Sequence, residues 1–315
     1  MSKTARRKSA GSQASYGIAE WYGELFVSLD ADKRREFLKP SSVPECPFLA
    51  SVPDLAPRGS SRCSKKGGVC SIRNFIQTED GGVEFGPITA TCPNRFYESR
   101  TVIEHVGLLL LGTGEPLVAK EIPFLRRSVL EIGASDIDAI DTGKDDVGKI
   151  DLVFLHPDKF PKEWCAVEMQ AVYFSGAAMS KDDDNIRGET GNAVPLPGGA
   201  RRPDFRSSGP KRLMPQLQIK VPSLRRWGKK MVVIVDKPFL AAMATMPSVD
   251  HISNCDIVWV VVDYQLGADL PTATLFVERV LYTTLEDSVV GLTAGTPTTL
   301  PDFEAKLSEK ARKLI

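Results

Sequence analysis

The chain has 315 residues, of which 42% are hydrophobic and 25% are charged, a composition typical of soluble globular proteins. Its 40 lysines and arginines balance 40 aspartates and glutamates, so the chain as a whole is no basic nucleic-acid binder, and any DNA contact must come from locally clustered charge. No apolar stretch approaches the roughly 20 residues of a membrane helix, and no secretory signal follows the basic start. These features predict a cytoplasmic protein, in which clustered cysteines are more often metal ligands than disulfides.

The first third of the chain is predicted to hold a tail, a helix and a loop-rich segment. Residues 1–13 are basic and then rich in Ser, Gly and Ala, which indicates a disordered tail. Apolar residues that include Ile18 and Trp21 recur at helical spacing and predict an amphipathic helix over residues 14–29. Residues 40–97 are rich in Pro and Gly and weak in apolar periodicity, so this segment cannot easily build a core of its own.

The rest of the chain is predicted to form a mixed α/β core. Helical patterns occupy residues 98–111, 212–227, 237–246 and 301–313. Strand-like runs occupy residues 117–124, 129–132, 149–156, 164–174, 231–236 and 256–263. The runs at 149–156 and 164–174 are separated by a short polar turn and predict a hairpin or two adjacent strands. Residues 180–211, with three consecutive aspartates, are predicted to be a loop. The order of elements favours an α/β (α+β) core over residues 98–315 and an N-terminal, cysteine-bearing module over residues 14–97.

The loop-rich segment carries four cysteines whose clustering indicates a metal site. They are Cys46, Cys63, Cys70 and Cys92. Four thiolates close the tetrahedral coordination sphere of zinc or iron and leave no position for a substrate, so such a site is structural. It would supply folding energy to a segment that lacks a core. The alternative is four unrelated buried thiols, which is the interpretation that we favour for Cys165 and Cys255 in apolar strands.

Two carboxylates in the predicted hairpin are candidates for a second metal site. Glu168 and Gln170 face the same side of their strand, and Asp151 on the neighbouring strand could lie beside Glu168. Two adjacent carboxylates repel each other unless a divalent cation lies between them, and oxygen ligands suit Mg²⁺. Mg²⁺ there could lower the pKa of a bound water and stabilise charge on a scissile phosphate. The alternative is that these residues are ordinary strand residues facing solvent.

A basic stretch over residues 200–230 is a candidate phosphate-binding surface. It contains ten basic residues and one acid: Arg201, Arg202, Arg206, Lys211, Arg212, Lys220, Arg225, Arg226, Lys229, Lys230 and Asp204. In a chain of zero net charge, such a cluster could bind DNA phosphates or read guanine edges. The alternative is a solvated loop and helix surface. Gln216 and Gln218 could read bases or could be surface residues.

Together these segments resemble the NotI-like family of type II restriction endonucleases. The resemblance is carried by residues 45–48 (ECPF), 66–73 (KGGVCSIR), 91–96 (TCPNRF) and 167–170 (VEMQ), with looser similarity at 120–122 (KEI) and 211–216 (KRLMPQ). It covers roughly residues 40–265. This chain departs from the family pattern at Asp151-Leu152, where Asp-Trp is common, and in the residues that follow Gln170.

The resemblance implies a PD-(D/E)xK core in its ExQ variant, and Mg²⁺-dependent hydrolysis of double-stranded DNA at a short GC-rich palindrome by a homodimer of a restriction-modification system. It implies iron in the four-cysteine site, although the sequence itself cannot choose iron over zinc. Apart from the resemblance, the sequence contains no phosphate-binding GxxxxGK(S/T) motif and no apolar stretch of membrane length, so neither a nucleotide cofactor nor a membrane contact is expected. By position it makes Asp151, Glu168 and Gln170 active-site residues. A further acid is expected upstream: Glu121 matches best, and Glu104 and Glu131 are rivals. Of the basic stretch, the expected DNA contacts are Arg201, Arg202, Arg206, Lys211 and Arg212.

The alternatives are a non-catalytic DNA-binding protein of the same fold and a structure-specific repair nuclease.

Overall fold

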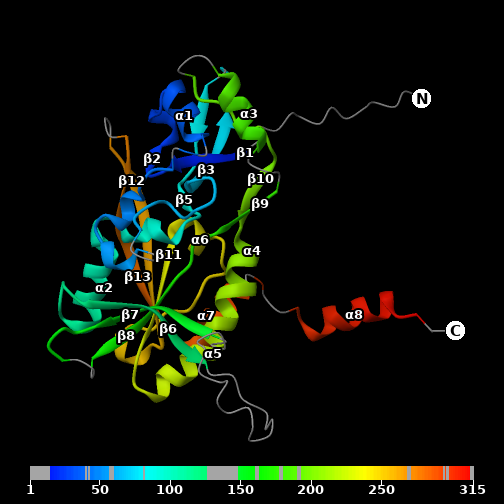
Figure 1. The fold of residues 1–315 in the computed structure, drawn as a ribbon. Helices are drawn as coiled ribbons and strands as arrows, with labels where there is room; N and C mark the ends of the chain where they lie inside the picture. Colours follow the sequence, from blue (N-terminus) through cyan, green and yellow to red (C-terminus); the bar gives the residue numbers. More distant parts are fainter. Residues whose placement is uncertain are drawn as a thin grey trace, which may run out of the picture.

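A computed structural model describes residues 15–39, 41, 43–56, 60–80, 82–125, 148–159, 163–176, 180–189, 193–267, 271–293, 295 and 298–312. It contains a central six-stranded sheet, a smaller N-terminal sheet at one end of it, and a C-terminal helix that stands away from the body (Figure 1). The predicted tail at residues 1–13 and the predicted strand at residues 129–132 lie outside the described residues.

The central sheet is mixed, as the sequence predicts. Its strands, in spatial order, are β13 (Ala273–Thr283), β12 (Ile257–Leu266), β11 (Met231–Asp236), β8 (Trp164–Met169), β7 (Gly148–Leu155) and β6 (Leu117–Leu125). β8, β11 and β12 are parallel to one another, and the remaining pairs are antiparallel. Successive residues of β11 are buried in two different apolar clusters, Val232 in one and Val233 in the other. The near-continuous apolar sequence of the central strands therefore reflects burial on both faces of the sheet.

Helices cover both faces of this sheet (Figure 1). α2 (Thr101–Leu111) lies on one face and α5 (Met214–Arg226) on the other, and both fall where the periodicity predicts them. Val106 of α2 belongs to one apolar cluster, whereas Leu217 and Val221 of α5 belong to the other. The other elements around the sheet are the π-turn η7 (Gly209–Leu213), α6 (Lys237–Ala241), η8 (Ile252–Asn254) and α7 (Leu285–Thr293).

The helix predicted over residues 237–246 is shorter in the structure, where α6 ends at Ala241. Asp236 caps the start of α6. Beyond its end, the N–H of Ala244 donates a hydrogen bond of 3.0 Å to the carbonyl of Gly291 in α7. This long-range bond, which local periodicity cannot reveal, takes the place of a further helical turn.

The prediction of an N-terminal amphipathic helix over residues 14–29 is wrong. The segment forms two antiparallel strands joined by Tyr22 and Gly23, which both have positive φ, 49° and 89°. A two-residue turn of that kind matches the twist of a hairpin. The N-terminal elements are β1 (Ser15–Trp21), β2 (Glu24–Leu25), η1 (Phe26–Ser28), α1 (Ala31–Phe37), β3 (Val69–Gln77), β4 (Val83–Phe85) and β5 (Thr89–Ala90).

The loop-rich segment shares the core of the rest of the chain, contrary to the expectation that it lacks one. Leu49 and Phe96 are buried in the same apolar cluster as Val106 of α2 and Leu152 of β7. The cluster is continuous across the predicted boundary at residue 97. Long-range packing therefore supplies the burial that the segment cannot generate locally. Its short helices are η2 (Pro47–Leu49), η3 (Pro53–Leu55) and η5 (Pro93–Arg100).

The loop predicted over residues 180–211 is partly regular in the structure. The aspartate run lies in a helix, and a short antiparallel pair of strands flanks it. The elements here are β9 (Tyr173–Gly176), α3 (Ser180–Gly188), β10 (Arg201–Asp204) and α4 (Phe205–Ser208). At the C-terminal end, α8 (Leu300–Lys310) is exposed along its whole length, in agreement with the predicted peripheral helix. Within the described ranges, no helix is long and apolar enough to cross a membrane.

Candidate active site

Asp151 and Glu168 lie opposite each other on the antiparallel strands β7 and β8. The register pairs Leu152 with Val167, which brings the preceding Asp151 beside the following Glu168. The backbone N–H of Asp151 lies 3.4 Å from Oε1 of Glu168, and the N–H of Met169 donates to Oδ2 of Asp151 at 3.1 Å. Each carboxylate is therefore held against the backbone of the other strand.

Burial makes this pair of carboxylates costly to ionise. Glu168 is 2% exposed, and burial, followed by the charge of Asp151, raises the pKa of Glu168 to about 7. Burial also raises the pKa of Asp151. A cation close to these two carboxylates would therefore stabilise their ionised forms.

Lys220 provides such a cation from helix α5, and the sequence interpretation missed this role. Its Nζ lies 2.6 Å from Oε1 of Glu168 and 2.8 Å from Oε1 of Gln216, one helical turn earlier. A signal was present in the sequence: Leu217, Val221 and Leu224 occupy the buried face of the helix, and residue 220 falls on the same face. The run of basic residues around Lys220 instead predicts a lysine on the surface.

Glu121 is the upstream acid that the structure brings near Asp151. The pairs on either side, Lys120 with Leu152 and Ile122 with Ile150, flank these two residues on β6 and β7. The negative charge of Glu121 contributes to raising the pKa of Asp151, after burial. Glu121 has a φ of 54°, in the left-handed region that non-glycine residues rarely adopt.

The rival acids are differently placed. Glu104 lies on α2, where its carboxylate is 3.8 Å from the guanidinium of Arg100, with half of its side chain exposed. Glu131 lies outside the described residues.

A pocket opens beside the carboxylates, with walls from both parts of the chain. Its volume is about 260 Å³, well above the roughly 10–15 Å³ that a cavity needs to hold one water molecule. The core contributes Asp151, Glu168, Gln170, Tyr173, Arg212 and Gln216, and the cysteine-bearing segment contributes Lys65, Thr91 and Pro93. Gln170 donates through Nε2 to the carbonyl of Ala171 at 2.6 Å. The pocket therefore has room for several water-sized groups.

The N-terminal part of the basic stretch borders this pocket. The guanidinium of Arg212 lies 3.5 Å from the centre of the Tyr173 ring, a cation–π contact that orders it at the pocket wall. Arg202, Arg206 and Lys211 are exposed. Arg201 differs from these residues, because its side chain is 1% exposed and pairs with Asp182 of α3.

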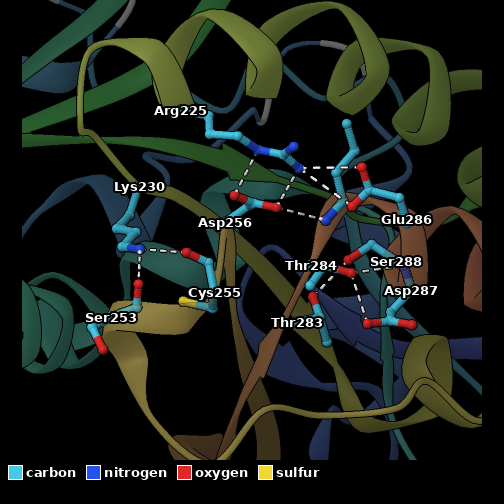
Figure 2. A network of polar contacts seen from close by, with 11 residues as sticks. Arg225, Lys230, Ser253, Cys255, Asp256, Thr283, Thr284, Glu286, Asp287 and Ser288 are labelled. Carbon is cyan, nitrogen blue, oxygen red and sulfur yellow. Dashed lines mark hydrogen bonds and ion pairs between the residues drawn. The ribbon is translucent and has the colours of Figure 1, made fainter.

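The C-terminal part of the basic stretch is engaged in structural contacts (Figure 2). Arg225 forms two hydrogen bonds with Asp256, at 2.9 and 2.6 Å, and a weaker contact with Glu286 of α7. Nζ of Lys230 donates to the carbonyl groups of Ser253 and Cys255. These contacts tie α5 and β11 to the start of β12, so these two side chains are less available to DNA.

Among the cysteines of the N-terminal segment, Cys46 and Cys92 lie close enough to Cys63 for their charges to influence it, and Cys63 and Cys92 do the same for Cys70. The N–H of Cys46 donates to the carbonyl of Ser61, and the N–H of Cys92 donates to the carbonyl of Cys70. All four are free, and three are buried. Burial, followed by the nearby Cys46 and Cys92, raises the pKa of Cys63. Among the residues that the structure describes, however, no group of three or more His, Cys, Asp or Glu side chains is arranged to hold a metal ion.

The mixed sheet flanked by helices is consistent with an α+β nuclease fold. A family model described as restriction endonuclease NotI matches residues 38–276, which is most of the chain. The chain therefore belongs to the NotI restriction endonuclease family, in agreement with the resemblance found over residues 40–265. It is a type II restriction endonuclease, a site-specific deoxyribonuclease that acts on double-stranded DNA. No curated protein matches the chain.

Proposed function

We propose that this NotI-family endonuclease requires Mg²⁺ and that Asp151, Glu168, Gln170 and Glu121 form its active site. The observation that carries the proposal is the pair of opposed carboxylates, Glu168 buried and Asp151 half-buried, at the wall of a pocket bordered by basic side chains. Two oxygen donors on rigid neighbouring strands fit Mg²⁺, which proteins commonly hold with one or two carboxylates together with substrate phosphates. Burial and the charge of Asp151 raise the pKa of Glu168, and a bound cation would favour its ionised form.

In this proposal, Asp151 and Glu168 hold the metal with their carboxylate oxygens, and the exposed carboxylate of Glu121 approaches it from β6. Mg²⁺, when bound, lowers the pKa of a bound water and stabilises negative charge on the scissile phosphate. The Gln170 amide, also at the pocket wall, orients the attacking water or a phosphate oxygen. Arg212, ordered by its stacking on Tyr173, contacts the DNA backbone.

We propose that Arg202, Arg206, Lys211 and Arg212 are the DNA-contacting part of the basic stretch. All four side chains are exposed, and Arg212 borders the candidate active site. Arginine recognises guanine through two hydrogen bonds in the major groove, which supports a GC-rich site. A palindromic site cut in both strands requires two symmetry-related active sites, so the proposed form is a homodimer. Its DNA substrate makes the cytoplasm the proposed location.

We propose that the N-terminal segment over residues 14–97 is a recognition module with iron or zinc bound by Cys46, Cys63, Cys70 and Cys92. The donor set fits a four-thiolate site, and the four thiols are neighbours. The arrangement described above does not itself surround an ion, so binding requires the thiols to close around it. Lys65 and Thr91 of this segment line the pocket, which supports a role in positioning DNA.

The test is cleavage of mixed plasmid DNA with Mg²⁺ and with EDTA, followed by sequencing of the fragment ends. We expect discrete fragments in Mg²⁺ only, with reproducible ends at a short palindrome. Intact DNA at all Mg²⁺ concentrations would favour a non-catalytic DNA-binding protein. Fragments whose ends follow DNA structure instead of sequence would favour a repair nuclease.

A further inference from the structure

Strand β8, which carries Glu168 of the candidate active site, contains no basic residue. Gln170 follows the Glu168 carboxylate on the same face of the chain, and its neutral amide is engaged with the carbonyl of Ala171. Hydrolysis of a phosphodiester develops negative charge, which a nearby fixed cation stabilises. Positive charge at this site therefore comes from other elements: Lys65 and Arg212 line the pocket, and Lys220 contacts the Glu168 carboxylate itself.

Lys220 of α5 forms an ion pair with a carboxylate of the site. Its Nζ lies 2.6 Å from Oε1 of Glu168, and the side chains of the two residues are 4% and 3% exposed. Oε1 of Gln216 accepts a second hydrogen bond from the same ammonium at 2.8 Å, and Gln216 itself lines the pocket. The ammonium is thus fixed between a carboxylate of the site and an amide at the pocket wall.

The position of Lys220 is poorly explained by stability alone. Leu217, Val221 and Leu224, which share the buried face of α5, are fully buried apolar residues. A buried ion pair gives little net stability compared with apolar residues of the same volume, because both charges lose their hydration. A lysine held among leucines and valines beside a candidate metal ligand points to a role in the reaction.

We propose that Lys220 is a positioning residue of the nuclease site: from helix α5 it supplies the positive charge that Gln170 does not, and it fixes the Glu168 carboxylate toward the bound metal. This inference rests on the proposed function, in which Glu168 is a metal ligand. Gln216 completes the arrangement by orienting the ammonium.

The test compares Lys220→Met, which keeps the length and removes the charge, with Lys220→Arg, which keeps the charge. Lys306→Met on the exposed helix α8 is the matched control. We expect Lys220→Met to lower kcat by about 100-fold with little change in KM or in DNA binding without Mg²⁺. Lys220→Arg should restore much of the lost rate, and the control should cleave like the wild type. Loss of rate only in proportion to loss of folded protein, measured by thermal melting, would show a structural role and overturn the inference.

A double variant separates action through Glu168 from direct action on DNA. If Lys220 acts through Glu168, then Lys220→Met causes no further loss in a Glu168→Ala background under single-turnover conditions with excess enzyme. Multiplying losses would overturn the positioning role. Full activity of Lys220→Met, with Glu168→Ala inactive, defeats this inference alone. Full activity of Glu168→Ala defeats the proposed function instead.

Discussion

The backbone N–H of Ala90 donates a hydrogen bond of 2.6 Å to Oδ2 of Asp236, a fully buried carboxyl at the end of the central strand β11. The other carboxyl oxygen accepts from the N–H of Phe239 at 2.9 Å, where it caps α6. Ala90 in turn accepts a hydrogen bond from the N–H of Val172, which lies shortly after the end of β8. One buried carboxyl thus connects the cysteine-bearing segment to the sheet that carries the candidate active site.

This connection predicts a pH-dependent stability. Burial raises the pKa of Asp236 to about 7, whereas an unfolded aspartate titrates near 3.9. Between these values the unfolded chain releases the proton that the folded chain retains, so the free energy of unfolding falls as pH rises from about 4 to 7, by at most roughly 4 kcal/mol. Asp236→Asn, which cannot ionise, should lose less stability than the wild type over this range. Urea unfolding at several pH values measures the difference.

Asp54→Asn, the same substitution at an exposed aspartate, is the matched control and is measured in parallel. Identical slopes for Asp236→Asn and the wild type would contradict the assignment. Glu168 contributes to the slope in the same direction, so only the difference between variant and wild type is diagnostic.

Removal of either opposed carboxylate should abolish cleavage. In Asp151→Ala and Glu168→Ala the site loses one metal ligand, and we expect the cleavage rate to fall by about 1,000-fold or more with DNA binding largely intact. Glu163→Ala, at an exposed acid before β8, is the control. Gel-based cleavage and binding assays separate the two effects, and full cleavage by either active-site variant would refute the site.

The contrast between Asp151 and Lys220 shows what local sequence can predict. A hairpin with alternating faces is sufficient to infer that Asp151 and Glu168 are neighbours, because strand register follows from a short turn. Lys220 lies on a helix more than fifty residues after Glu168, and its partner is set by how α5 packs on the sheet. The local pattern of apolar residues correctly predicts most strands of the central sheet, because these strands are long and apolar.

The failures at the N-terminal end have the same physical origin. Tyr22 and Gly23 reverse the chain in a segment whose apolar residues happen to match a helical period, and the turn decides the structure. Leu49 and Phe96 are buried by residues far away in sequence, so the core of their segment could not be recognised from its own composition. Glu121 was identified by resemblance, and its opposition to Asp151 depends on the register of β6.

Arg95 should be important for the junction between the N-terminal sheet and the central sheet. Its guanidinium is completely buried, pairs with Glu20 of β1 and Glu98, and donates to the carbonyl of Ala273 in β13. In Arg95→Met, two carboxylates lose their counter-ion, and we expect a loss of roughly 3–5 kcal/mol of unfolding free energy in urea. Arg100→Met, at a partly exposed arginine whose contact with Glu104 is long, should cost little. Equal stability of the two variants would argue against this role.

Arg212 should contribute to DNA affinity through the phosphate backbone. Its side chain is exposed at the pocket wall and ordered by Tyr173. We expect Arg212→Ala to weaken DNA binding about tenfold and to reduce the slope of log affinity against log salt by about 1. Arg225, already bound to Asp256, provides the contrast, because Arg225→Ala should leave this slope unchanged. An unaltered slope for Arg212→Ala would remove it from the DNA-binding surface.

Metal removal should separate the two proposed metal sites. Four free thiols that are neighbours in a loop-rich segment predict bound iron or zinc in the purified protein, detectable by elemental analysis and, for iron, by visible absorption. Cys70→Ser removes a buried ligand, so we expect loss of this metal, a lower melting temperature and weaker DNA binding. The Cys255→Ser variant, at a buried cysteine outside the segment, should retain the metal.

Because Asp151 and Glu168 belong to β7 and β8, the residual folded Cys70→Ser protein should respond to Mg²⁺ as the wild type does. Purified wild-type protein without iron or zinc would contradict the four-cysteine site while leaving the nuclease site standing.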